Sequence, residues 1–486
     1  MAVGKEKNDP SKTSAAHDLM APRIALMNVL MGGTEALRSA GEDYLPKHAA
    51  ESDNNYRERL GRSVLVNYFR RSVLSLVGKP FSNPIILEDD MPPALVEISE
   101  DIDHQGNHIN VFASNVFQDG LLKGLTHILV DYPNTVEAGV ATKEDEVNLN
   151  ATPYFIHIAP ENILAAYAEQ RNGKEFLTHV RIYEEDVERD GFDEIIIQRV
   201  RVLEPGKWQL WRKGAKNKWS LESEGITSLD YIPLFTFYAD REGFMTAHPP
   251  LTDLAWVNIA HWQSSSDQTN ILTVARFPML AASGVNEDEA QVKVGPRQLL
   301  TTQSADGKYY YVEHTGAAIE SGRQHLEDLK EEMSILGIEL LKKTGDATAT
   351  AKAIDTAENL SMLQKMTLMF SDILEQAYQA AADWLKLGKS GSVRINTDFG
   401  LALGDQTDQG TLLAARTGKE ISHKAFVREL QRRKILADDF DMEADQAELD
   451  AEKEQAMVDL AFQVKMEQEG VLPKQKQPGQ PDPNKE

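Results

Sequence analysis

Residues 251–275 read LTDLAWVNIAHWQSSSDQTNILTVA, and residues 320–343 read ESGRQHLEDLKEEMSILGIELLKK. The first stretch has an apolar edge that includes Leu254 and Trp262, but its centre from 261 to 270 is rich in hydroxyl and amide groups. The second carries an apolar stripe at helical spacing, formed by Leu326, Leu329, Met333, Leu336 and Leu340. Both stretches are therefore predicted to be helices.

The polar centre of the first helix is unusual. A core helix of a monomer should show a continuous apolar stripe. A helix that is polar around its circumference more often packs edge-on against copies of itself or lines a wet passage. This segment therefore indicates assembly more clearly than catalysis.

Short strands are predicted between the two helices, and a loop and a long helix after them. The strands are expected near 279–282, 291–294, 298–302 and 309–313. Small residues from Thr344 to Thr350 predict a flexible loop. A stripe of apolar residues from Ile354 to Trp384 then predicts one long amphipathic helix.

The N-terminal half combines helices with an antiparallel sheet. Helices are predicted over 17–37, 56–77 and 107–123, and the first of them is ended or broken at Gly32-Gly33. A strand is predicted over 126–130. A period of two then predicts strands at 154–158, 176–183, 194–203, 208–211 and 234–238, with turns at 171–173 and 214–217. Further helices are expected at 408–416, 422–433 and 440–468, and disorder at both termini. The predicted fold class is α+β.

Composition limits the function. The chain has 486 residues, no cysteine, and 76 acidic against 51 basic residues, which gives a net charge of −25. This length predicts two to four subdomains, and the charge disfavours tight wrapping of nucleic acid. The absence of cysteine excludes disulfides and thiol chemistry. Because no signal peptide or spanning helix is recognisable, synthesis in the cytosol is the simple interpretation.

The chain offers few candidates for catalysis or metal binding. Gly388-Lys389-Ser390 is similar to the end of a phosphate loop, but it follows a predicted helix, so we interpret it as a helix end. His104 and His108 could bind one metal ion only if the segment between them were helical. The surrounding sequence predicts a solvated loop instead. No catalytic residue, metal site or cofactor is therefore predicted.

Two basic groups leave alternatives open. The cluster Arg57, Arg59, Arg62, Arg70 and Arg71 lacks interleaved aromatic residues, so ion pairs or an interface are favoured over nucleic acid. Lys342-Lys343 either complement the negative end of a helix dipole or provide a weak DNA contact.

Several ordered phrases point to a family. They are YRERL at 56–60, GKPF at 78–81, GLTHILVDYP at 124–133, the stretch from 277 to 323, and GKEIS at 418–422. In this order and spacing, over nearly the full length, the chain resembles tailed-bacteriophage portal proteins of a group catalogued as a phage domain of unknown function.

The resemblance implies a structural protein of the virion that is not an enzyme. Portals form rings, usually of twelve copies, at one capsid vertex. Double-stranded DNA passes through them without sequence specificity during packaging and ejection. Expected partners are sister subunits, the large terminase, the major capsid protein or scaffold, and a head-tail adaptor, with no membrane. Assembly would take place in the host cytoplasm.

The resemblance also implies a division of the chain. The expected parts are a disordered N-terminus (1–16), a wing (17–250), stem helix 1 (251–275), a clip (276–319), stem helix 2 (320–343), a tunnel loop (344–350), a long wing helix and strand (351–407), a helical crown (408–470) and a disordered tail (471–486).

Site residues follow from these parts. The expected stem and oligomer interface comprises His261, Gln263, Ser264, Ser265, Asp267, Gln268, Asn270, Leu326, Leu329 and Met333. The expected DNA-channel residues are Lys342, Lys343, Thr344, Gly345, Asp346, Thr348 and Thr350. The expected docking residues of the clip are Met279, Val294, Pro296, Tyr309 and Tyr311.

Two other classes remain open. A scaffolding or tail-adaptor protein is also acidic and helical, although scaffolds lack a sheet such as 153–240 and adaptors are usually much shorter. A metal-dependent phage enzyme would require a cluster of carboxylates that the sequence does not reveal.

Overall fold

The computed structural model describes residues 9–133, 151–214, 217–276, 279–283, 306–312, 316–341, 360–399, 406–418, 420–432, 436 and 440–468. It divides into two compact units, the first ending at Phe399 and the second beginning at Gly400. Helices and antiparallel sheets occur together, so the fold is α+β, as predicted.

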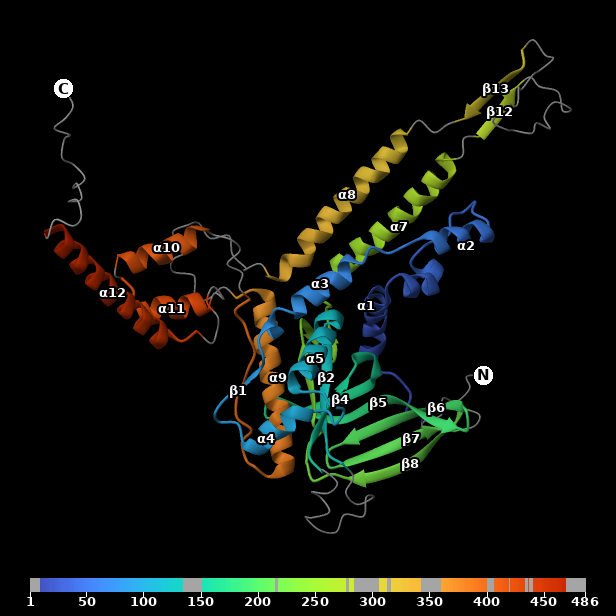
Figure 1. The fold of residues 1–486 in the computed structure, drawn as a ribbon. Coiled ribbons are helices and arrows are strands. Elements are labelled where there is room, and N and C mark those ends of the chain that lie inside the picture. Colours follow the sequence, from blue (N-terminus) through green and yellow to red (C-terminus); the bar gives the residue numbers. More distant parts are fainter. Residues whose placement is uncertain are drawn as a thin grey trace. The chain divides into compact units, whose positions relative to one another are not determined.

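Unit 1 contains most of the helices and the described strands (Figure 1). Its helices are α1 (Ala15–Ala40), α2 (Asp53–Arg62), α3 (Tyr68–Val77), α4 (Pro93–Ile98), α5 (Ile109–Lys123), α7 (Thr252–Ala275), α8 (Ala317–Ile338) and α9 (Met362–Leu385). Short 3-10 turns occur at Gly41–Asp43, Pro80–Ser82, Ser99–Asp101, Pro160–Asn162 and Glu339–Leu341.

Two sheets make up the predicted antiparallel region. The first has the order β3-β2-β9, from β2 (Leu125–Asp131), β3 (Tyr154–Ile158) and β9 (Leu234–Tyr238). The second is a meander of β4 (Ile163–Arg171), β5 (Lys174–Asp190), β6 (Asp193–Glu204), β7 (Lys207–Lys213) and β8 (Trp219–Ile226). Three small pairs complete the set: β1 (Ile86–Leu87) with β14 (Val393–Arg394), β10 (Arg241–Gly243) with β11 (Thr246–Ala247), and β12 (Met279–Ser283) with β13 (Lys308–Val312).

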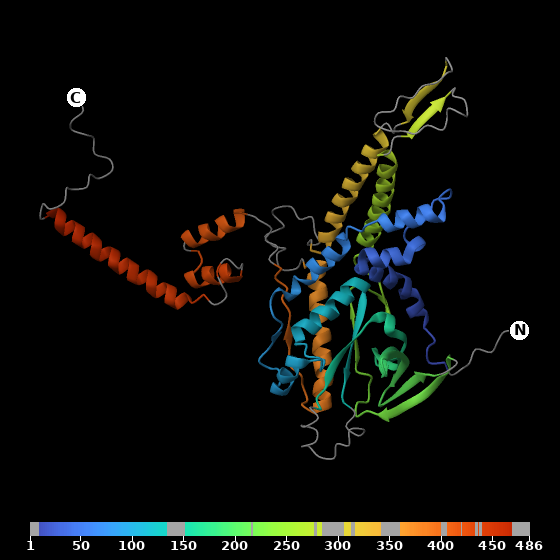
Figure 2. The same cartoon turned by 45° about the vertical axis from the view of Figure 1, so that its right-hand side comes forward.

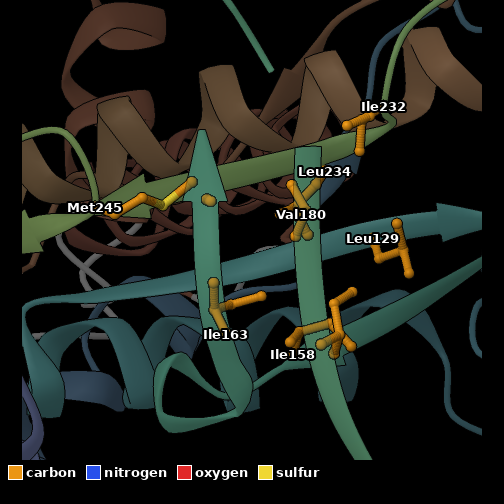
Figure 3. Close-up of a cluster of buried hydrophobic side chains, with 9 residues drawn as sticks. Leu129, Ile158, Ile163, Val180, Ile232, Leu234 and Met245 are labelled. Atoms are coloured by element: carbon orange, nitrogen blue, oxygen red, sulfur yellow. The ribbon is translucent and has the colours of Figure 1, made fainter. Parts of the chain in front are cut away.

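The central sheet is buried on both faces. On one face, Phe117 of α5 stacks on Phe237 of β9 with ring centroids 5.5 Å apart, and Phe370 of α9 lies 5.0 Å from Phe237. On the other face, apolar residues of the two sheets meet in one cluster, which includes Leu129 of β2 and Val180 of β5 (Figure 3). Strand β2 is therefore an apolar strand covered on both sides.

Two helices differ from the prediction. The single helix expected over 56–77 is two helices, because Asn67 has non-helical backbone geometry and its side chain accepts a hydrogen bond from Arg70 N, which caps α3. The long helix expected from Ile354 begins at Met362 among the described residues, since Ser361 and Gln364 form a capping box. Helix α1 is kinked at Gly33, where a break was predicted.

Unit 2 consists of helices where they were predicted. These are α10 (Gln406–Thr417), α11 (His423–Arg432) and α12 (Met442–Gln468). Val427 of α11 is buried, whereas Leu449 and Phe462 of α12 are exposed. Over the described residues of the chain, no helix is both long and apolar enough to cross a membrane.

Burial of His127 in β2 predicts acid sensitivity. Burial and the neighbouring His157 lower the pKa of His127 from 6.5 to about 3. Because the unfolded chain takes up a proton near pH 6.5 and the folded one does not, stability is lost as the pH falls below about 6.5. This group should cost about 2 kcal/mol between pH 7 and pH 5.

Urea unfolding at both pH values measures this effect. His127→Gln should remove about 2 kcal/mol of the pH dependence, whereas His325→Gln, at an exposed position of α8, should leave it unchanged. An unaltered pH dependence in His127→Gln would contradict the prediction.

Candidate assembly site at the paired helices

Helices α7 and α8 run side by side in opposite directions (Figures 1 and 2). Gln268 Nε2 of α7 donates a hydrogen bond of 2.8 Å to the carbonyl oxygen of Ile319 in α8. A Cβ atom on Gly322 would lie only 2.1 Å from Gln268 Oε1, so glycine permits this close approach. Leu329 and Met333 of the α8 stripe are buried. The predicted apolar stripe therefore packs within the chain.

The polar centre of α7 also has partners within the chain. Gln263 Nε2 donates to Tyr44 O at 2.6 Å, and Ser266 Oγ lies 2.7 Å from Ser63 Oγ. Two turns earlier, Asn258 accepts a hydrogen bond from the backbone N–H of Phe69 and donates to Val66 O. The polarity of this helix therefore does not by itself require sister subunits, which corrects the reasoning from sequence.

Arg59 of α2 anchors this region. Its side chain is 1% exposed, and its guanidinium group binds both carboxylate oxygens of Glu51 at 2.8 Å. It also donates to Pro46 O at 2.9 Å and lies 3.7 Å from a carboxylate oxygen of Asp267 in α7. The hydrogen bonds from Arg59 lower the pKa of Glu51 to about 2. The prediction that the arginine cluster forms ion pairs is confirmed for Arg59.

His261 lies between α7, α3 and α8. Its side chain is 2% exposed, and the Tyr68 ring meets it edge-on with centroids 6.1 Å apart. Burial, and then the nearby charge of Lys330, lower its pKa. Neither ring nitrogen has a hydrogen-bond partner among the residues that the structure describes. His261 therefore packs as a neutral side chain inside the chain.

The other predicted interface residues lie closer to solvent. The Asp267 carboxylate is half-exposed and lies 3.3 Å from His48 Nε2. Three further residues of α7 and one of α8 are half-buried, namely Ser264, Ser265, Asn270 and Leu326. Their assignment to an oligomer interface stays a prediction.

The segment predicted to form a clip is described only in part. Strands β12 and β13 pair antiparallel, with Met279 opposite Val312, Leu280 opposite Tyr311 and Ala282 opposite Tyr309. Val294 and Pro296 lie outside the described residues, as do the strands expected at 291–294 and 298–302. The predicted channel residues Lys342, Lys343 and 344–350 also lie outside them.

The weak motifs have structural roles. Helix α9 ends at Leu385, and Ser390 N donates to Gln379 Oε1 at 3.1 Å, which confirms that 388–390 is the connection after a helix. His104 stacks on Tyr154, and His108 accepts a hydrogen bond from Asn110 N at the start of α5. In the described ranges, no three acidic or histidine side chains come together as metal ligands.

Sequence reasoning missed three residues that shape the site. Gly322 and Gly337 of α8 allow close approach of neighbouring elements, since a Cβ atom on Gly337 would lie 2.5 Å from Ser72 Oγ. Asn258 holds the start of α3 through hydrogen bonds with Phe69 in the helix and with Val66 just before it. Glycines inside an otherwise amphipathic helix are the signal that could have revealed the first two.

Comparisons with known proteins give limited matches. Residues 250–385 match a family model described as "Domain of unknown function (DUF4055)". None of the curated proteins matches the chain.

Among solved structures, the chain is similar to one titled "Virion of native gene transfer agent (GTA) particle", with 12% identity over 74% of this chain and 87% of that one, at a TM-score of 0.36. It is similar to another titled "Neck of empty GTA particle computed with C6 symmetry", with 14% identity over 73% and 86% of the two chains, at a TM-score of 0.37.

The contact between Gln268 and Gly322 gives a test of the helix pair. Gln268→Ala should cost about 1 kcal/mol, because the Ile319 carbonyl, which stays within the backbone ladder of α8, loses its side-chain donor. Gly322→Ala should cost less, because displacement of the Gln268 side chain is offset by about 1 kcal/mol of helix propensity that alanine gains over glycine. The two changes should not be additive, since Gln268→Ala removes the group that the new Cβ would meet. Thermal unfolding of both single variants and the double variant measures this coupling, and simple additivity would contradict the geometry.

Proposed function

We propose that this chain is the repeating subunit of a portal ring at one capsid vertex of a tailed phage. The ring would be the passage for double-stranded DNA and the docking platform for the large terminase and a head-tail adaptor. The observation that carries the proposal is the arrangement of α7, β12, β13 and α8: two paired helices joined by a segment containing a β pair. This arrangement has the order of stem, clip and stem that the ordered sequence phrases imply.

Two further features support the proposal. The base of the helix pair is braced by buried polar contacts, including the ion pair of Arg59 with Glu51 and the hydrogen bonds of Asn258. Such contacts fix the start of α7 against α3 and the region of α2, as the proposed stem requires. The family match, although it names no function, spans 250–385 and so includes this whole segment.

Charge explains how DNA could pass without sticking. Each copy has a net charge of −25, so a ring would have a strongly negative channel, and narrow passages focus such a field. Repulsion from the phosphates keeps DNA centred and lets it slide in both directions. Lys342, Lys343 and the loop 344–350 would soften this barrier locally. No covalent step belongs to this chain in the proposal.

Electron microscopy of the purified full chain tests the proposal, together with mass measurement in solution. The expected result is a ring with a central hole, with a mass many times the 54.2 kDa of one chain. Compact single copies or rods under all assembly conditions would overturn it. If rings form, deletion of 344–350 tests the loop: normally filled heads would show that the loop has no role in packaging.

A further inference from the structure

Helix α3 packs against α8 at one defined point. A Cβ atom on Gly337 would lie 2.5 Å from Ser72 Oγ, so the side of α3 that bears Ser72 faces the side of α8 that bears Gly337. Since each residue advances about 100° around a helix, positions two before and two after such a contact point the opposite way.

The far side of α3 is basic and apolar. Arg70 and Leu74 lie two positions on either side of Ser72, and Arg71 lies beside them. Leu74 is 50% exposed, and both arginines are exposed. Neither guanidinium group pairs with a carboxylate within the part of the chain that the structure describes. We call Arg70, Arg71 and Leu74 the basic face.

The far side of α8 is acidic and apolar. Ile335 lies two positions before Gly337 and is 51% exposed. Asp328, Glu331 and Glu332 are exposed on the same side, one to two turns earlier. Glu331 and Glu332 form no ion pair with any described residue. We call Asp328, Glu331, Glu332 and Ile335 the acidic face.

We propose that the basic face of one copy binds the acidic face of the next copy. Each face combines a half-exposed aliphatic side chain with charges that no described residue pairs with, and the two charges are opposite in sign. Because the faces point to opposite sides of the α3–α8 pair, the same contact can repeat from copy to copy, which gives a ring when the rotation closes. A contact with two-fold symmetry would instead place each face against the same face of the other copy, and so bring like charges together. The inference rests on the proposed function and names the surfaces through which its subunits join.

The association of two copies depends on opposite charges meeting at this contact. Every copy carries a net charge of −25, so copies repel one another except where opposite charges meet. Reversing one face therefore adds repulsion at the only place where the proposal requires attraction.

Two charge-reversed variants of the full chain test the contact. Arg70→Glu/Arg71→Glu makes both faces acidic, and Glu331→Lys/Glu332→Lys makes both basic. Each variant alone should remain single copies where the wild type assembles, with an apparent dissociation constant raised about 100-fold or more. An equimolar mixture should recover an assembly that contains the two variants in a 1:1 ratio. Native mass spectrometry measures both results.

A matched control and a folding check separate the outcomes. Glu448→Lys/Glu452→Lys, at exposed positions of α12, changes the net charge by the same amount as Glu331→Lys/Glu332→Lys and should leave assembly unchanged. Far-ultraviolet circular dichroism of each variant should match the wild type, because the substituted side chains are exposed. A wild type that never assembles overturns the proposed function. If the wild type assembles and each single-face variant alone assembles equally well, this inference is overturned and the proposed function stands.

Discussion

Arg59→Met is expected to lower the free energy of unfolding by about 3–5 kcal/mol, because it leaves a buried carboxylate without its partner. The Arg59 side chain is 1% exposed and the Glu51 side chain is 8% exposed. Two hydrogen bonds of 2.8 Å join them, and a third reaches Pro46 O. Methionine keeps most of the side-chain volume, so the loss reflects charge and hydrogen bonding. Urea unfolding at pH 7, followed by tryptophan fluorescence, measures it.

The double variant Arg59→Met/Glu51→Gln separates the ion pair from packing. It should recover part of the loss, since no unpaired charge remains buried. Arg57→Met, on the exposed side of the same helix, should change stability by less than about 0.5 kcal/mol. Equal losses for Arg59→Met and Arg57→Met would show that the buried pair does not anchor α2 to α7.

The stability at low pH should also reveal the ion pair between Arg59 and Glu51. The pKa of Glu51 lies at about 2 in the folded chain, against 4.5 ordinarily. A carboxylate with a lowered pKa stabilises the fold above its ordinary pKa, and this contribution is lost as the pH falls from about 4.5 towards 2. Arg59→Met should lack this portion of the acid sensitivity.

Helices with a single apolar stripe were predictable from sequence, and their ends were less so. The stripe of α8 and the three helices of unit 2 lie where the pattern predicts them. The division between α2 and α3 was missed because Asn67 falls at helical spacing, although it acts as a cap. Periodicity reports which side is buried, and it does not report where the backbone leaves the helix.

The five-stranded sheet was recognised only in part. The turn at Asn172-Gly173 was predicted and has the positive φ angles that such a turn requires. Strand β4 was missed because its alanines do not alternate clearly with polar residues, and β8 because its WSLESEGI sequence is largely polar. In both strands, pairing with a neighbouring strand overrides weak local preference.

The polar centre of α7 marks the limit of sequence reasoning at the site. Its hydroxyl and amide groups were expected to meet sister subunits, yet Ser266 meets Ser63 and Gln263 meets Tyr44. These partners lie 203 and 219 positions away in the chain, so no local pattern could reveal them. The chemistry of buried polar groups required partners, and only the fold could say which ones.

Gly124→Ala is expected to cost about 3 kcal/mol, because two effects act at one position. Gly124 has φ of 89°, where residues with a Cβ atom are strained, and an added Cβ would lie 3.0 Å from backbone atoms of His248 and Pro249. It joins α5 to β2, and its carbonyl accepts a hydrogen bond from Ala239 N at 2.8 Å. The segment that it touches leads directly into α7, so the change strains the connection between the central sheet and the helix pair.

The turn glycine Gly173 provides a control for the backbone effect alone. Its φ is 78°, and an added Cβ would have no atom within 4 Å. Gly173→Ala should therefore cost only the conformational strain, about 1–2 kcal/mol. The excess for Gly124→Ala, measured by urea unfolding of both variants, isolates the close approach of the sheet to the segment before α7. If the two variants lose equal stability, the strand and that segment are not in firm contact, and the helix pair is not held at its base through Gly124.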